Sequence, residues 1–139
     1  MKYLSALAFA VVLICSCGNK NKIVGEWTST GQYEENEVLI FKEDGTMLAV
    51  RGKTGESTFP FKTGLVKYSL NTSTNPNQID YIFYDQEGKE EIFKLKGIIE
   101  FLGETSARIG FNANKKELMD MLTRPKDFSS CDIKMLSKK

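Results

Sequence analysis

Short runs in which apolar and polar residues alternate make up most of the chain after residue 22, and this pattern limits the fold more than any other feature. Alternation with a period of two is typical of strands that bury one face. Glycine, asparagine, aspartate or proline bounds most of the runs, and these residues are typical of turns. We therefore predict eight strands, at residues 23–30, 38–41, 46–50, 65–70, 78–84, 91–101, 106–111 and 131–136.

The connections between these strands are mostly short, which favours antiparallel neighbours. Asp44-Gly45 lies between two apolar runs, and this dipeptide is a strong signal for a tight hairpin turn. Residues 71–77 and 85–88 are also rich in turn-forming residues, and residues 116–122 can form one or two helical turns. The pattern predicts an all-β fold, an eight-stranded antiparallel up-and-down barrel with one short helical turn before the last strand. A two-sheet sandwich is the alternative.

Aromatic residues occupy many of the positions that alternation places on the inner face of this barrel. An eight-stranded barrel is just wide enough to be filled by side chains or to hold one small ligand. Large aromatic rings favour filling, whereas tyrosine hydroxyls that converge in a cavity would orient a ligand. Both interiors stay open as alternatives. The ligand-binding candidates are Tyr68, Tyr81, Phe83, Phe93 and Phe111.

The first residues of the chain have the profile of a secretion signal. Lys2 precedes an uncharged apolar run, which is shorter than the ~20 residues that a membrane-spanning helix needs. Ile14-Cys15-Ser16-Cys17 resembles the lipobox of bacterial lipoproteins, and this resemblance implies cleavage before Cys17 and acylation of that cysteine. We expect a signal peptide at residues 1–16, an acylated cysteine and tether at 17–22, and one domain at 23–139. A secreted protein with an incidental cysteine is the alternative.

The composition argues against several kinds of chemistry. The 19 lysines and arginines balance 18 acidic residues, so the chain lacks the basic surplus with which proteins neutralise nucleic-acid phosphates. It has no histidine, which is the commonest general base and metal ligand. Glu34, Glu35 and Glu37 form an ordinary acidic loop in this interpretation. We therefore expect a non-enzymatic protein with no metal, no cofactor and no nucleic-acid partner.

The last cysteine is expected to be structural. Cys15 leaves with the signal peptide and Cys17 is acylated, so Cys131 has no partner for an intramolecular disulfide. Alternation places Cys131 on the inner face of the last strand together with Ile133 and Met135. We expect Cys131 to be a small buried hydrophobic residue.

Several motifs resemble a known family of barrels. Gly25-Glu26-Trp27 on the first predicted strand is similar to the Gly-x-Trp signature of lipocalins and their calycin relatives. Further stretches resemble a bacterial lipocalin-like domain family of uncharacterised function, at residues 41–45, 68–70, 75–80, 97–101 and 124–128. The resemblance covers nearly the whole predicted domain. It implies a barrel in which Gly25 and Trp27 close the base, and it implies no established activity.

The same resemblance implies a late basic residue that lies across the face of the signature tryptophan. Arg124, just before the last predicted strand, is our candidate for this cation, and Lys134 is the second. A cation over an indole contributes ~0.5 to 2 kcal/mol, depending on how well water is excluded. We expect this contact to be structural.

These observations predict a lipid-anchored protein of the cell envelope that binds a small hydrophobic or amphipathic molecule inside its barrel. Outer-membrane anchoring with the domain facing the periplasm is the preferred location, because Gly18 follows the acylated cysteine where inner-membrane lipoproteins often carry aspartate. The alternative is a protein-interaction or inhibitor module with a filled barrel. That module would act through the loops at residues 51–64 and 112–128, and the apolar tip Phe59-Pro60-Phe61 motivates it.

Overall fold

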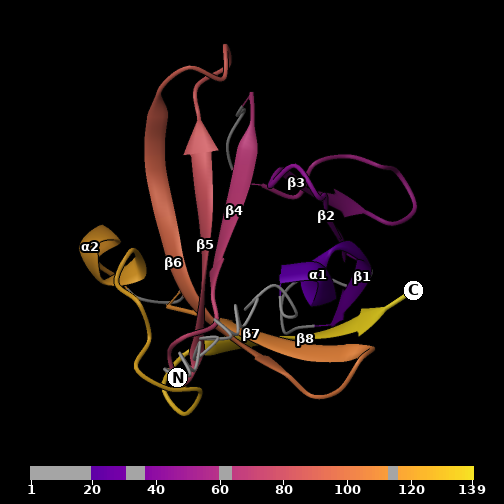
Figure 1. Cartoon of the computed structure of the whole chain (residues 1–139). Helices are drawn as coiled ribbons and strands as arrows, with labels where there is room; N and C mark the ends of the chain where they lie inside the picture. Colours follow the sequence, from indigo (N-terminus) through magenta and orange to yellow (C-terminus); the bar gives the residue numbers. More distant parts are fainter. Residues whose placement is uncertain (1–19, 31–36, 60–63, 113–115) are drawn as a thin grey trace, which may run out of the picture.

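The computed structural model describes residues 20–30, 37–59, 64–112 and 116–139, and almost all of its regular structure is β-strand (Figure 1). Nearly every strand begins and ends within two residues of the alternating run that predicts it. The elements are α1 (Lys20–Ile23), β1 (Gly25–Thr30), β2 (Glu37–Phe41), β3 (Met47–Arg51), β4 (Val66–Asn71), β5 (Asn77–Tyr84), β6 (Glu91–Phe101), β7 (Ser106–Phe111), α2 (Leu118–Met121) and β8 (Asp132–Lys138).

All eight strands belong to one antiparallel sheet, in the order β3-β2-β1-β8-β7-β6-β5-β4. Each strand therefore pairs with its neighbour in the sequence, and β8 returns to pair with β1. The first and last strands of the sheet, β3 and β4, meet at a narrow seam where Thr46 and Lys67 form an isolated bridge. The backbone N–H of Tyr68 also donates to the carbonyl of Gly45 across this seam, at 2.9 Å. The predicted up-and-down barrel is confirmed as nearly closed, and so is the short helix before the last strand.

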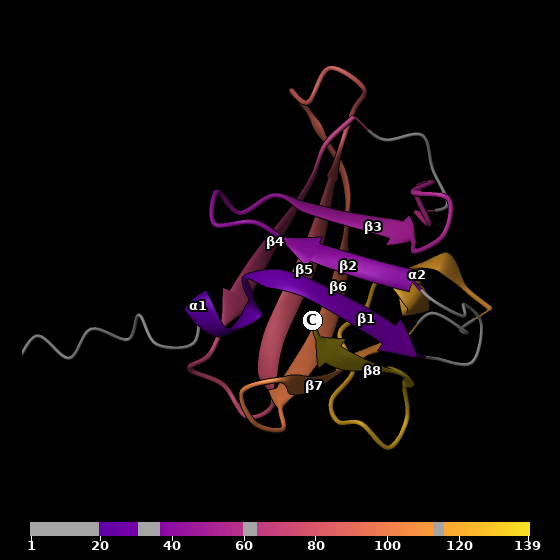
Figure 2. The same ribbon diagram turned by 90° about the vertical axis from the view of Figure 1, so that its right-hand side faces the viewer.

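The two ends of the barrel differ. At one end, which we call the base, lie α1, the end of β8 and the tight connections at residues 42–46, 72–76 and 102–105. At the other end, which we call the mouth, the longer connections after β1, β3, β5 and β7 leave the sheet. Figure 2 shows α1 and α2 on opposite sides of the barrel, with α1 beside the start of β1.

The hydrophobic core lies inside the barrel. Side chains that share the inner face of their strands form one buried cluster, because alternate residues of each strand point inward. Members of this cluster that are almost completely shielded from solvent include Ile23, Trp27, Leu39, Phe41, Met47, Ile79, Ile99 and Ile109.

Trp27 lies at the base of the barrel, and the cation over its ring is Lys138, which is neither of our two candidates. The indole is fully buried, and its Nε1–H donates to the carbonyl oxygen of Ile23 at 2.7 Å. Lys138 Nζ lies 5.3 Å from the centre of the indole ring and donates to the carbonyl oxygen of Lys22 at 3.0 Å. Gly25 has a φ of 128°, and a Cβ at this position would lie 3.0 Å from Lys138 Cε. The glycine therefore leaves room for the lysine that crosses the base.

Arg124, our sequence-based candidate for that cation, binds elsewhere. Its guanidinium pairs with Asp80 at 2.7 Å and donates to the carbonyl oxygen of Gly97 at 2.5 Å. Asp80 alternates with the inward-facing Ile79 and Tyr81, so the ion pair lies on the outer face of β5. Arg124 thus fastens the connection between α2 and β8 to the outside of the barrel wall. That connection starts near the mouth, which is why Arg124 does not serve the base.

The second candidate, Lys134, also lies elsewhere, because the alternation of β8 is opposite to our prediction. Leu136 is 3% exposed and belongs to the core, whereas Met135 is 42% exposed. Lys134 shares the inner face with Leu136 and forms an ion pair there. A polar residue on the inner face breaks the apolar alternation, and this shifted the predicted face of β8 by one residue.

Cys131 consequently lies outside the barrel wall. Cys131 precedes β8 and packs against the outward-facing Gly110. A Cβ at Gly110 would lie only 2.5 Å from the Cys131 Sγ. Ile98 and Phe128 surround the same glycine. Burial and the neighbouring carboxylates Asp132 and Asp127 raise the pKa of the Cys131 thiol. A raised pKa suits a packing role, since the thiolate is the reactive form of cysteine.

The arrangement at the base predicts how Trp27 responds to substitution. Trp27 is the chain's only tryptophan, so its fluorescence reports this site alone. We expect Lys138→Met to change the emission of Trp27 and to lower the free energy of unfolding by ~1 to 2 kcal/mol, because it removes the cation and its hydrogen bond. Arg124→Met serves as the control and is expected to leave the emission unchanged. The reverse pattern in fluorescence-monitored urea titrations would contradict the arrangement.

Candidate ligand-binding site in the barrel interior

Four of the five predicted ligand-binding residues come together inside the barrel. The ring centroid of Tyr81 lies 4.9 Å from that of Phe111, and Phe83 stacks on Phe93 with centroids 4.3 Å apart and an interplanar angle of 10°. Phe59 joins the two pairs, because its ring contacts Tyr81 at 6.5 Å and Phe83 at 5.1 Å, both edge-on. Contacts of this geometry are favourable beyond the area they bury. The residues form a continuous aromatic surface from β5, β6, β7 and the segment after β3.

The fifth candidate, Tyr68, has a separate role at the seam. Its hydroxyl donates to the carbonyl oxygen of Lys42 at 2.8 Å, and its ring meets Phe41 edge-on at 5.1 Å. Burial, together with the charges of Asp44 and Glu43, raises the pKa of Tyr68. Tyr68 therefore joins β4 to the turn after β2 near the base and reaches the aromatic surface only through Phe41, which lies 6.3 Å from Tyr81.

Gly97 makes room for the ring of Phe111. A Cβ at Gly97 would lie within 3 Å of three atoms of that ring, so no other residue fits at this position without displacing it. β6 pairs with β5 in regular register at this point, where Gly97 faces Ile79, so the glycine forms no bulge in this pair. The glycine instead allows a close approach between a backbone and an aromatic ring.

Phe59 turns inward, contrary to the exposed apolar tip that motivates the protein-interaction alternative. Its ring is partly buried against the core, and the preceding Thr58 is fixed by a backbone hydrogen bond from its N–H to the carbonyl of Ala49 at 2.9 Å. Pro60 and Phe61 lie outside the described residues. The described part of the tip therefore belongs to the interior site.

A buried carboxylate lies on the mouth side of this interior, and our sequence interpretation missed it. Glu37 is the first residue of β2, is 3% exposed and shares the inner face with Leu39 and Phe41. The sequence did contain a signal for this position: Glu37, Leu39 and Phe41 are alternate residues of one strand and therefore point to the same face. The acidic-loop interpretation is therefore wrong for Glu37. Glu34 and Glu35 lie outside the described residues.

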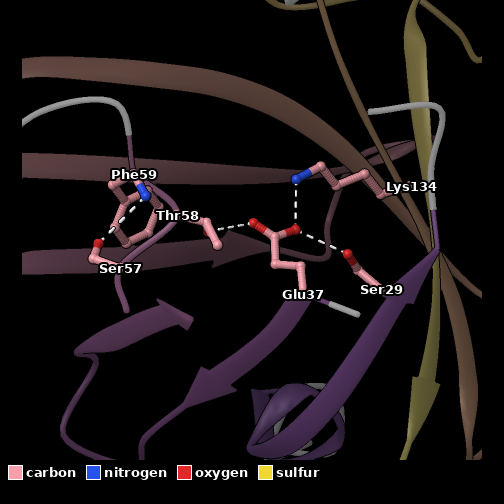
Figure 3. Close-up of polar contacts among 6 residues, drawn as sticks. All are labelled: Ser29, Glu37, Ser57, Thr58, Phe59 and Lys134. Carbon is pink, nitrogen blue, oxygen red and sulfur yellow. Dashed lines mark hydrogen bonds and ion pairs between the residues drawn. The ribbon is translucent and has the colours of Figure 1, made fainter. Parts of the chain in front are cut away.

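Three side chains from three different segments bind the Glu37 carboxylate (Figure 3). Ser29 of β1 donates to Oε2 at 2.8 Å, Thr58 donates to Oε1 at 2.6 Å, and Lys134 Nζ of β8 lies 2.6 Å from Oε2. The Lys134 side chain is 40% exposed, so the ion pair has one partner in the interior and one partly in solvent. Both carboxylate oxygens therefore have partners, which a buried charge requires.

The environment of Glu37 keeps it ionised. Burial alone would raise the pKa of Glu37, but the charge of Lys134 and the hydrogen bonds from Lys134, Thr58 and Ser29 outweigh burial and hold the pKa below its ordinary value of 4.5. The negative charge also acts on the aromatic surface. Burial, together with Glu37, raises the pKa of Tyr81, so this phenol stays protonated at neutral pH and can donate a hydrogen bond.

Comparisons of this chain with protein-family models, curated proteins and solved structures find no match. Over the described residues, no cluster of three or more histidine, cysteine, aspartate or glutamate side chains is suited to hold a metal ion. Within that same part of the chain, no helix has the length and apolar character to cross a membrane.

This geometry combines two kinds of recognition. The aromatic side chains supply apolar rings, and the Glu37–Lys134 pair places both signs of charge next to them. Ligand sites in proteins are typically apolar surfaces with a few placed polar groups that fix orientation. A molecule with one apolar and one polar part matches this arrangement.

The depressed pKa of Glu37 predicts how stability depends on pH. The folded protein binds this proton less readily than the unfolded chain, so the stabilisation is present above the ordinary pKa of 4.5 and is lost as pH falls through the lower folded-state value. We expect the free energy of unfolding to fall more steeply on the acid side in the native protein than in Glu37→Gln. Urea titrations between about pH 3 and 6 measure this difference.

Asp44 and Asp127 also have lowered pKa values, but both are present in native protein and variant alike and cancel in the comparison. Equal acid-side slopes for the two proteins would contradict the buried pair.

Proposed function

We propose that the chain is a lipid-anchored envelope protein whose lipocalin-like barrel binds a small hydrophobic or amphipathic molecule. The observation that carries this proposal is the aromatic surface of Tyr81, Phe111, Phe59, Phe83 and Phe93 beside the Glu37–Lys134 pair. The apolar part of the ligand would lie against the rings. Its polar part would point towards the charged pair and the mouth.

The buried pair supports a binding role over a purely structural one. Replacing a buried ion pair by well-packed apolar residues is often neutral or stabilising, so such a pair is weak evidence for a stability role. Glu37 is 3% exposed and shares the inner face of β2 with apolar residues, and Lys134 is partly open to solvent. Polar groups placed in this way give a ligand one orientation.

The lipid anchor rests on the sequence motif that ends at Cys17. A single acyl chain gives only marginal membrane binding, whereas two or three chains hold a protein stably. Outer-membrane anchoring with the domain in the periplasm remains our preferred location. In this proposal the protein is not an enzyme, because Glu37, the one buried carboxylate among the described residues, already has its partners arranged around it.

Two neighbouring residues of β6 provide a matched test of binding. Phe93 faces the aromatic surface, whereas Ile92 is 57% exposed. We expect Phe93→Ala to weaken the binding of an environment-sensitive apolar dye about tenfold, which corresponds to ~1.4 kcal/mol. Ile92→Ala is the control and is expected to leave dye affinity unchanged. Fluorescence titration measures both variants, and Trp27 emission reports that each is folded.

An equal effect of the two substitutions would contradict binding at the aromatic surface. Failure of the native protein to bind any apolar dye, with or without prior removal of bound lipid, would contradict the proposed function as a whole.

A protein-interaction role is the second candidate, and the exposed face of α2 favours it. Leu118 is 66% exposed and Met119 is 75% exposed, next to the mouth, in the long connection before β8. We expect the double variant Leu118→Ser, Met119→Ser to abolish crosslinks to an envelope partner in intact cells while dye binding stays unchanged. Crosslinks that persist in the double variant, or that form at the outward-facing Leu48 instead, would remove α2 as the contact surface.

A further inference from the structure

The segment that leads to the proposed lipid anchor is fixed firmly to the base of the barrel. Ile23 is fully buried, and its carbonyl oxygen accepts the hydrogen bond of the Trp27 indole. The carbonyl oxygen of Lys22 accepts from Lys138 Nζ at 3.0 Å, and Lys22 Nζ pairs with Glu104 at 3.3 Å. The contacts come from β1, from β8 and from the turn between β6 and β7. The chain is therefore held in place from Lys22 onward.

Covalent geometry limits how far Cys17 can lie from this fixed point. Cys17 lies five positions before Lys22 in the sequence, and a fully extended chain spans at most ~3.6 Å per residue, so the cysteine lies within about 18 Å of Lys22. The wall of the barrel is longer. The 11 residues of β6 run from Phe101 at the base to Glu91 at the mouth, a path of about 33 Å at ~3.3 Å per residue. The tether is too short to carry an anchor from the base to the mouth.

We propose that the base of the barrel faces the membrane and that the mouth faces away from it. This inference rests on the proposed acylation of Cys17. The partner surface is the headgroup region of a phospholipid bilayer, and the turn at residues 102–105 lies against it. Leu102 in this turn is 50% exposed and gives the base an apolar side chain at the membrane.

The orientation limits where the ligand comes from. Because the Glu37–Lys134 pair and the partly exposed end of the site lie on the mouth side, the ligand enters from the aqueous compartment. A soluble molecule or a soluble donor supplies it. Direct extraction from the bilayer that holds the protein would need the opposite end of the barrel to touch the membrane.

Site-directed labels at the two ends of the full acylated chain test this orientation. Thr105 lies in the base turn and Glu90 in the connection before β6, and both are exposed. A fluorophore is attached to Thr105→Cys or to Glu90→Cys, each in a Cys131→Ala background, and the protein is reconstituted into vesicles that contain nitroxide-headgroup lipid. We expect at least fourfold stronger quenching at Thr105 than at Glu90. Equal quenching, or stronger quenching at Glu90, would overturn the orientation.

Two further measurements separate the possible failures. Mass spectrometry of the purified chain reports the acyl groups: a chain without them would overturn the anchor and the orientation with it, whereas an acylated chain with equal quenching would overturn the orientation alone. Hydrogen exchange of the unlabelled acylated protein, with and without vesicles, makes the same comparison without substitutions. We expect protection at residues 102–105 and none at 85–90, and the reverse would also overturn the proposal.

Discussion

The burial of Trp27 at the base is the interaction on which the rest of the barrel depends. Its indole joins three parts of the chain, because its N–H binds the carbonyl of Ile23, its ring lies in β1, and Lys138 of β8 crosses its face. β1 and β8 are far apart in sequence but pair directly in the sheet. A fully buried aromatic side chain at this junction joins the two parts of the sheet, β1–β3 and β4–β8, and fills the base of the barrel that they form.

The polar side chains that bind the buried carboxylate gather at the end of the barrel opposite Trp27. The buried residues near Trp27 are apolar, whereas Ser29, Glu37, Thr58 and Lys134 form a polar cluster on the mouth side. The aromatic surface connects the two regions. The barrel is thus polarised along its axis, and the proposed ligand, the proposed anchor and the direction of entry all follow from that polarity.

The sequence predicts the strands and their order well because hairpins depend on local signals. Asp44-Gly45 and the turn-rich residues 71–77 act on their immediate neighbours, and alternation identifies the inner face of strands such as β5 and β7. The same logic brings Tyr81, Phe83, Phe93 and Phe111 into one interior. These features need no knowledge of contacts between distant residues.

The polar cluster could not be predicted in the same way, because a charge looks like a surface residue until its partner is known. Glu37 and Lys134 lie 97 positions apart in the sequence, and only the folded barrel brings them together as an ion pair. Because Lys134 is a charged residue on the inner face of β8, the alternation of this strand indicates the wrong face. The sequence pattern therefore placed Cys131 inside the barrel rather than outside. The sequence indicated Arg124 and Lys134 rather than Lys138 for a related reason: several cations lie late in the chain, and only the contacts of the folded barrel decide which of them reaches Trp27.

Native mass spectrometry of the protein purified from the membranes of its own host shows whether the barrel holds a ligand. We expect a discrete added mass, beyond the acyl groups, that corresponds to one small amphipathic molecule and decreases in the Phe93→Ala variant. Repeated spectra of the native protein with no added mass, under conditions that retain weakly bound lipids, would contradict a ligand-binding interior.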